Sequence, residues 1–213
     1  MTESHALTVG LSYPIAPEDR ARADFYALLS RLYAAAPDAA LLRAIAAADP
    51  LSIAVDHGPA HDLATSWRVL GTASAAMDPA AASGEYQDLF VGVGKSEVSL
   101  HASAYVPNTG RSELATVRAT LAGLGLGRKS GVSVYEDHLS AVCETMRVLV
   151  AGSVGVEPFA LTDQRRFFDT HLGSWVFACC TAIKACPIAN YYRRVAEFTE
   201  FFMAIERDSF AIE

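Results

Sequence analysis

The sequence predicts an all-α protein, and three observations support this prediction. Apolar residues recur at spacings of three and four along most of the chain, which is the period of an amphipathic helix. The strict alternation of apolar and polar residues that is typical of strands is nearly absent. The 213 residues are 52% hydrophobic and 19% charged, which is enough apolar material for a packed core. At ordinary helix lengths we expect about eight to ten helices.

The first half of the chain carries clear helix signals. Pro17, followed by Glu18 and Asp19, is typical of a helix start, because proline suits the first position and acidic residues suit the first turn. Asp38 and Asp78 predict the caps of two further helices. The side chains predicted to face inward on these helices and on the one between them are Phe25, Leu28, Leu29, Leu32 and Tyr33; Leu41, Leu42 and Ile45; Leu63, Trp67, Leu70, Ser74 and Met77; and Tyr86, Leu89, Phe90 and Val93.

The helical pattern breaks between Gly92 and Gly110, where Gly94 and Pro107 add further breakers. We predict a non-helical or short-helical crossover here. One interpretation divides the chain into an N-terminal helical lobe (1–95), a crossover or hinge (96–110) and a C-terminal helical lobe (111–213). The alternative is a single helical domain.

The central helix is predicted to open in the stretch from Gly131 to Leu139. Ser133 and Glu136 fit a capping box, and Gly152 is a plausible stop. The predicted apolar stripe consists of Tyr135, Leu139, Val142, Met146 and Leu149. On this helix His138 borders the stripe and Asp137 points nearly opposite to it. A helix with Leu114, Val117, Leu121 and Leu124 precedes it, joined through a Gly-rich hinge that contains Gly123, Gly125, Gly127 and Gly131.

Two more helices are predicted at the C-terminal end. Thr162 is expected to cap one long helix, and Pro187 separates it from the last one. The inward residues are Phe168, His171, Leu172, Trp175 and Ile183, then Tyr191, Val195, Phe198, Phe202 and Ile205. Trp67 and Trp175 both lie on apolar stripes, so we predict that both are buried.

Charge and composition exclude several classes of protein. The net charge is −7, from 24 acidic and 17 basic residues, whereas a nucleic-acid binder needs a basic face. No stretch reaches the length of about 18 apolar residues that a membrane span requires. Met1 to Tyr13 lacks the basic start and apolar run of a secretory signal, so we expect a cytoplasmic protein. The four cysteines are not spaced as Cys-x-x-Cys and are interpreted as reduced thiols.

The acidic stretch from Glu136 to His138 has two interpretations. Acidic residues in a first helical turn favour the helix dipole and need no further role. Alternatively, a carboxylate and an imidazole beside an apolar stripe form a recognition point for a partner. The residues by themselves leave both interpretations open.

Four blocks of the sequence together resemble a known family. The motif Y-x-x-L-F-x-G begins at Tyr86, S-x-Y at Ser103, E-D-H-L at Glu136, and F-x-x-H-L-x-x-W at Phe168. Their order and spacing resemble the TorD/DmsD family of redox-enzyme maturation chaperones, over roughly residues 20–205. Prolines are frequent before S-x-Y in that family but absent here, and Leu100-His101 is similar to a pair in the related NarJ branch.

The resemblance implies a chaperone without catalytic activity and without a cofactor of its own. Its implied partner is the catalytic subunit of a molybdenum-cofactor enzyme, bound through an N-terminal, often twin-arginine, leader peptide until the cofactor is inserted. Such a peptide needs carboxylates beside a hydrophobic groove. The predicted peptide-binding residues are Tyr135, Glu136, Asp137, His138, Leu139, Leu100, Ser103 and Tyr105. Because Asp137 is predicted to point away from the packed stripe, Asp137→Ala should weaken peptide binding with little loss of stability.

Two other functions are alternatives to this one. A NarJ-like chaperone would serve a reductase subunit that is not exported. A metal-dependent helical hydrolase would use His101, Asp137, His138 and His171, but no H-x-x-x-H or E-x-x-H pattern exists. We therefore expect no metal. We expect a monomer, with a domain-swapped dimer as the alternative that the Gly-rich hinges leave open.

Overall fold

The computed structural model describes residues 13–52, 57–107, 112–128, 131 and 133–212. These residues form nine α-helices and two short helical turns, and β-pairing among them is limited to two isolated bridges. The α-helices are α1 (Pro17–Ala34), α2 (Ala39–Ala46), α3 (Pro59–Ala76), α4 (Pro79–Tyr86), α5 (Glu113–Gly123), α6 (Leu139–Ala151), α7 (Leu161–His171), α8 (Val176–Ala185) and α9 (Tyr191–Ile212). A π-helical turn, η1 (Gln87–Val91), and a 3-10 turn, η2 (Ala102–Ala104), complete the set. The predicted all-α class and helix number are confirmed.

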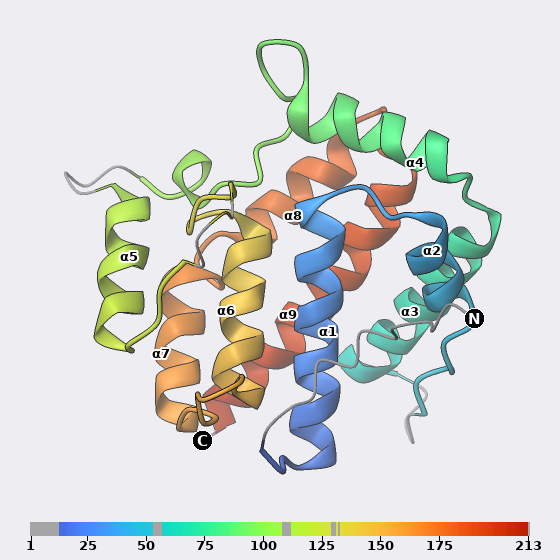
Figure 1. The fold of residues 1–213 in the computed structure, drawn as a ribbon. Helices are drawn as coiled ribbons and strands as arrows, with labels where there is room; N and C mark the ends of the chain where they lie inside the picture. The colour runs from blue at the N-terminus through green and yellow to red at the C-terminus, as the bar shows by residue number, and fades with distance from the viewer. Residues whose placement is uncertain (1–12, 53–56, 108–111, 129–130, 132, 213) are drawn as a thin grey trace, which may run out of the picture.

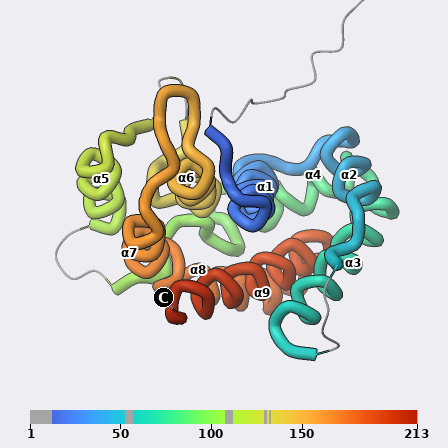
Figure 2. The backbone as a smooth tube through the Cα atoms, turned by 90° about the horizontal axis from the view of Figure 1, so that it is seen from below, coloured from blue at the N-terminus to red at the C-terminus, as the bar shows by residue number. Residues whose placement is uncertain are grey.

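Helices from both ends of the sequence share one hydrophobic core. Helix α1 packs along α6, and α9 packs on α3 and α8 (Figure 1). Seen from below, α9 runs along one side of the molecule from α7 towards α3 (Figure 2). Helices assigned to the two predicted lobes are therefore in direct contact, while the division into lobes itself stays a prediction.

The local helix signals are confirmed in several places. Helix α1 begins at Pro17. The Asp38 carboxylate accepts a hydrogen bond from the Leu41 N–H at 2.7 Å, and Asp78 caps α4 in the same way. Helix α6 ends at Gly152, whose φ of 69° favours glycine. Trp67 and Trp175 are both buried, as predicted.

The prediction that α6 begins near Ser133 with a capping box is wrong. The helix begins at Leu139, with His138 as its N-cap. The Leu139 N–H donates to the Leu100 carbonyl at 2.8 Å, and the Ala102 N–H donates to the Asp137 carbonyl at 2.9 Å. These two bonds tie residues 137–139 to the crossover, and Glu136 and Asp137 form a turn instead of a helical start. Tyr135 consequently lies outside the helix and is 53% exposed, not part of its stripe.

The prediction of one long helix capped by Thr162 is also wrong. Helix α7 begins after Ala160 and ends at His171, and α8 begins only at Val176, so the helix is interrupted between them. At the break both Leu172 and Gly173 donate their N–H groups to the Phe168 carbonyl. A Cβ at Gly173 would lie 2.8 Å from the buried Phe168 ring, so any larger residue here would force that ring to shift.

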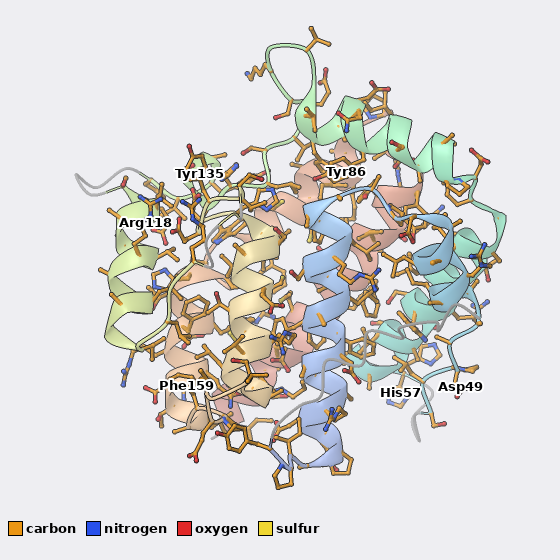
Figure 3. All side chains as sticks on the ribbon, viewed as in Figure 1. Asp49, His57, Tyr86, Arg118, Tyr135 and Phe159 are labelled. Atoms are coloured by element: carbon orange, nitrogen blue, oxygen red, sulfur yellow. The ribbon has the colours of Figure 1, made fainter. Side chains whose placement is uncertain are left out.

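The crossover is non-helical apart from η2, as predicted, in the part that the structure describes. Its start is set by Gly92, which has a φ of 64° and whose Cβ would lie 2.2 Å from the Lys95 carbonyl oxygen. This turn directs Val93 into solvent, so the prediction that Val93 faces inward is wrong. Tyr86 does lie in the core, where its hydroxyl donates to the Tyr33 carbonyl at the end of α1 (Figure 3). The prediction for Gly110, and most of that for Met1 to Tyr13, fall outside the described residues.

Candidate functional site

The crossover and the start of α6 meet at a backbone bridge between His101 and His138. The bridge brings together the two segments that contain the predicted peptide-binding residues, Leu100 to Tyr105 and Tyr135 to Leu139. Residues that are more than thirty positions apart in the sequence therefore form one site. The stretch Val134 to Ser140 contributes side chains both to a cluster of three aromatic rings and to a pocket.

Asp137 is the polar centre of the bridge and is only 3% exposed. Its Oδ1 lies 3.0 Å from Nδ1 of His101. Burial alone would raise the pKa of Asp137, but the hydrogen bond and charge of His101, helped by Ser103, outweigh it and lower that pKa. The carboxylate is thus ionised at neutral pH and held inside the protein.

This placement corrects the expectation that Asp137 points away from the packed face. A buried carboxylate that joins two segments stabilises the fold, since its removal leaves its partners unsatisfied. Asp137→Ala should therefore lower stability as well as any binding that depends on the bridge.

His138 caps α6 with its side chain. Nδ1 accepts a hydrogen bond from the Ser140 N–H at 3.2 Å and lies 2.8 Å from the Ser140 hydroxyl oxygen. Because Nδ1 is an acceptor, the neutral imidazole carries its proton on Nε2. Burial and the nearby charge of His101 lower the pKa of His138 to about 4, against the opposing effect of Asp137. A neutral imidazole is the form that this cap requires.

A pH-dependent contribution to stability follows from the His138 cap. The pKa falls from 6.5 to about 4 on folding, so the unfolded chain binds a proton in this range that the folded chain does not. The contribution is fully present above pH 6.5 and is lost as the pH falls towards 4. Between neutral pH and pH 4.5, we expect wild type to lose about 1–3 kcal/mol more stability than His138→Asn.

Asparagine is the matched replacement because it also caps helices but does not titrate. The measurement is urea unfolding of both proteins across this pH range. Equal losses in the two proteins would show that His138 makes no such contribution.

Three rings form the ring cluster, defined as His101, Tyr135 and His138. The His101 ring lies edge-on to His138 at 4.9 Å and is 6.3 Å from Tyr135. Tyr135 lies at the same end of the molecule as Arg118 (Figure 3). The cluster thus places a largely exposed aromatic ring next to two imidazoles, one of which binds Asp137.

The same stretch also lines a pocket of about 420 Å³. Helices α1, α5 and α6 and the segment that leads into α6 line it, and the lining is mainly apolar. The lining residues are Ser30, Ala34, Leu121, Leu126, Gly127, Arg128, Val134, Glu136, Ser140, Ala141, Glu144, Thr145 and Val148. Its volume lies within the range of ligand pockets, roughly 300–1,000 Å³.

Glu136 provides a carboxylate in the pocket wall. Its side chain is 12% exposed, and Oε2 lies 3.0 Å from Arg118. Oε1 lies 3.8 Å from Nε of Arg128. Burial works against ionisation, but the Arg118 and Arg128 guanidiniums lower the pKa of Glu136. The pocket thus combines an apolar wall with the ionised carboxylate of Glu136.

A family model with the description "Nitrate reductase delta subunit" matches residues 56–181, more than half of the chain. The chain belongs to this family. The match includes the crossover, the ring cluster and most of the pocket. No curated protein matches the chain significantly.

Membership in the nitrate reductase delta subunit family supports the resemblance at the level of the redox-enzyme maturation chaperones. The family consists of molybdoenzyme assembly chaperones, not enzymes. It implies a nitrate-reductase-type molybdoenzyme subunit as partner. The TorD/DmsD subgroup stays a prediction.

The other predicted peptide-binding residues take different places. Leu100 and Leu139 are buried in the core, and the hydrogen bond between their backbones holds the two segments of the site together. Ser103 is exposed. Tyr105 is half-buried, stacks on Trp175 with 5.8 Å between the rings, and donates its hydroxyl to the Ser99 carbonyl.

Residues proposed for the hydrolase alternative are not assembled into one centre. His171 is buried elsewhere, between Glu113 at 3.0 Å and Thr120 at 2.8 Å. In the described part of the chain, no group of three or more metal-ligating side chains is gathered. Likewise, none of the helices described there is long and apolar enough to cross a membrane.

Sequence reasoning missed the pocket because its walls come from distant helices. Ser30 and Ala34 of α1 face Ser140 and Ala141 of α6. The small side chains leave space there, and they were the only signal in the sequence. Helical periodicity does not indicate which helices face each other.

Proposed function

We propose that this chaperone binds the N-terminal, twin-arginine leader of a molybdoenzyme catalytic subunit in the cytoplasm and holds it until the cofactor is inserted. The observation that carries this proposal is the apolar pocket with the Glu136 carboxylate in its wall, beside the stretch Tyr135 to Leu139. A leader of this kind combines guanidiniums with an apolar segment. The two chemistries match a carboxylate next to an apolar wall.

The binding mode follows from the pocket and the ring cluster, which lie next to each other along the stretch Val134 to Ser140. An apolar side chain of the leader enters the pocket between α1 and α6, where Ala34, Ala141 and Val148 form part of the wall. The neighbouring part of the leader lies over the ring cluster, where a guanidinium can stack on Tyr135 or His101. Burial of apolar side chains provides affinity, and the charged contacts provide specificity.

Filling the pocket tests this proposal. Ala141→Phe places a large side chain in the pocket wall without removing a core contact, so leader binding should weaken at least about tenfold, or about 1.4 kcal/mol. The measurement is calorimetric titration with the twin-arginine leader peptide of a molybdoenzyme catalytic subunit.

Ala81→Phe is the matched control, because Ala81 is exposed on α4 and does not line the pocket. It should bind as wild type does, and thermal unfolding should show that both variants are folded. A folded Ala141→Phe protein with wild-type affinity would place the leader elsewhere.

A second candidate is a NarJ-like role for a reductase subunit that is not exported. The description of the matching family favours it, and so does the Leu100-His101 pair. The same titration with the N-terminal peptide of a non-exported catalytic subunit discriminates the two. Tighter binding of that peptide than of the twin-arginine leader would establish the second function.

A further inference from the structure

We propose that Glu136 receives an arginine side chain of the bound leader, and that Arg128 occupies this carboxylate until the leader arrives. The inference rests on the proposed function and specifies how the same site chooses its ligand. It makes Arg128 an internal competitor for the leader arginine.

The two carboxylate oxygens of Glu136 make different contacts with arginines. Oε2 is bound by Arg118, whose Nε and Nη2 both lie 3.0 Å away. Oε1 faces Arg128, but the Nε–Oε1 distance of 3.8 Å is longer than a hydrogen bond. In the described part of the chain no other side chain donates a hydrogen bond to Oε1, so this oxygen of an ionised carboxylate can accept one from a better donor in the pocket.

Arg128 is well placed to leave. It lies in the segment between α5 and α6 and its side chain is 37% exposed, so its guanidinium can return to water. Ion pairs of this exposed kind contribute little stability. A leader arginine that makes a true charge-assisted hydrogen bond to Oε1 is the stronger partner.

Charge balance explains why an exchange is needed. Glu136 is surrounded by two arginines, so a third cation would meet net positive charge if Arg128 stayed in place. Replacement of one guanidinium by another leaves the local charge unchanged. Glu144, the other acid of the pocket, is less available because Arg147 binds both of its oxygens at 2.7–3.0 Å.

The test is calorimetric titration of the full chain with two peptides, the leader itself and the leader with its arginines replaced by glutamine. Arg128→Gln should bind the arginine leader about three- to tenfold more tightly than wild type, since it removes the competitor. Glu136→Gln should bind that leader about tenfold more weakly. Neither variant should change the affinity for the glutamine leader.

Arg166→Gln is the matched control, because Arg166 also pairs with a carboxylate, Asp163, but does not line the pocket. Weaker or unchanged leader binding by Arg128→Gln would overturn the inference, and so would equal weakening of both peptides by Glu136→Gln. Arg128 is exposed and its variant keeps Arg118 on Glu136, so this arm does not depend on the folding of the Glu136 variant. If wild type binds neither peptide, the proposed function itself fails, which is a distinct result.

Discussion

Replacement of Trp175 by alanine is expected to lower the free energy of unfolding by about 3–5 kcal/mol. The indole is 1% exposed and lies at the break between α7 and α8. Its Nε1 donates to the His171 carbonyl at 2.7 Å, and Tyr105 of the crossover stacks on it. The variant would lose core contacts and leave a buried carbonyl without its donor. Denaturant unfolding measures the change.

Tyr135→Ala is the matched aromatic control. Its ring is largely exposed in the ring cluster, so its replacement should change stability by no more than about 0.5 kcal/mol. A loss below about 1 kcal/mol for Trp175→Ala, far under the range for a packed tryptophan, would show that the indole does not hold the two helices and the crossover together.

The second large effect is expected for Glu206→Gln, with a loss of about 3 kcal/mol. Glu206 is a buried carboxylate of α9 that binds Arg22 of α1 through two hydrogen bonds of 2.8 and 2.9 Å. It also accepts from the Tyr26 hydroxyl at 2.9 Å. Burial alone would lower the pKa of Arg22, but the hydrogen bond and charge of Glu206 raise it. The neutral amide would leave a largely buried guanidinium with only the more exposed Asp19 as its counter-charge.

Asp19→Asn is the control for Glu206→Gln, because Asp19 is the other carboxylate on Arg22 but is 40% exposed. Its loss should cost less than about 1 kcal/mol, as for other exposed ion pairs. Thermal or urea unfolding of both variants gives the comparison. Equal effects of the two substitutions would mean that burial does not set the strength of this cluster.

Features with a local cause could be predicted from the sequence. Pro17, Asp38 and Asp78 start helices because their own backbone and side-chain chemistry suits those positions. The apolar stripes identified the core, including both tryptophans. These signals lie within a few residues of the structure that they determine.

Features with a distant cause could not be predicted in this way. The spacing of Ser133 and Glu136 fits a capping box when only the local sequence is considered. In the structure the hydrogen bond from the Leu139 N–H to the Leu100 carbonyl accompanies a helix start at Leu139 instead. The crossover, which contains Leu100, also provides His101, and Asp137 is buried against that side chain. The candidate site was thus identified in the right segments, while the roles of its residues depended on the tertiary structure.

The stretch Val134 to Ser140 contributes to both the pocket and the ring cluster, and this constrains its length. Val134, Glu136 and Ser140 line the pocket, whereas Tyr135 and His138 belong to the ring cluster. The stretch is held at two positions, since Arg118 binds Glu136 and the crossover binds Leu139. Insertion or deletion of one residue between these anchors would displace Asp137 and His138, and so disturb the contact with His101, the ring cluster and the cap of α6 together. Changes to the pocket or to the ring cluster therefore have to be made by substitution here, at constant chain length.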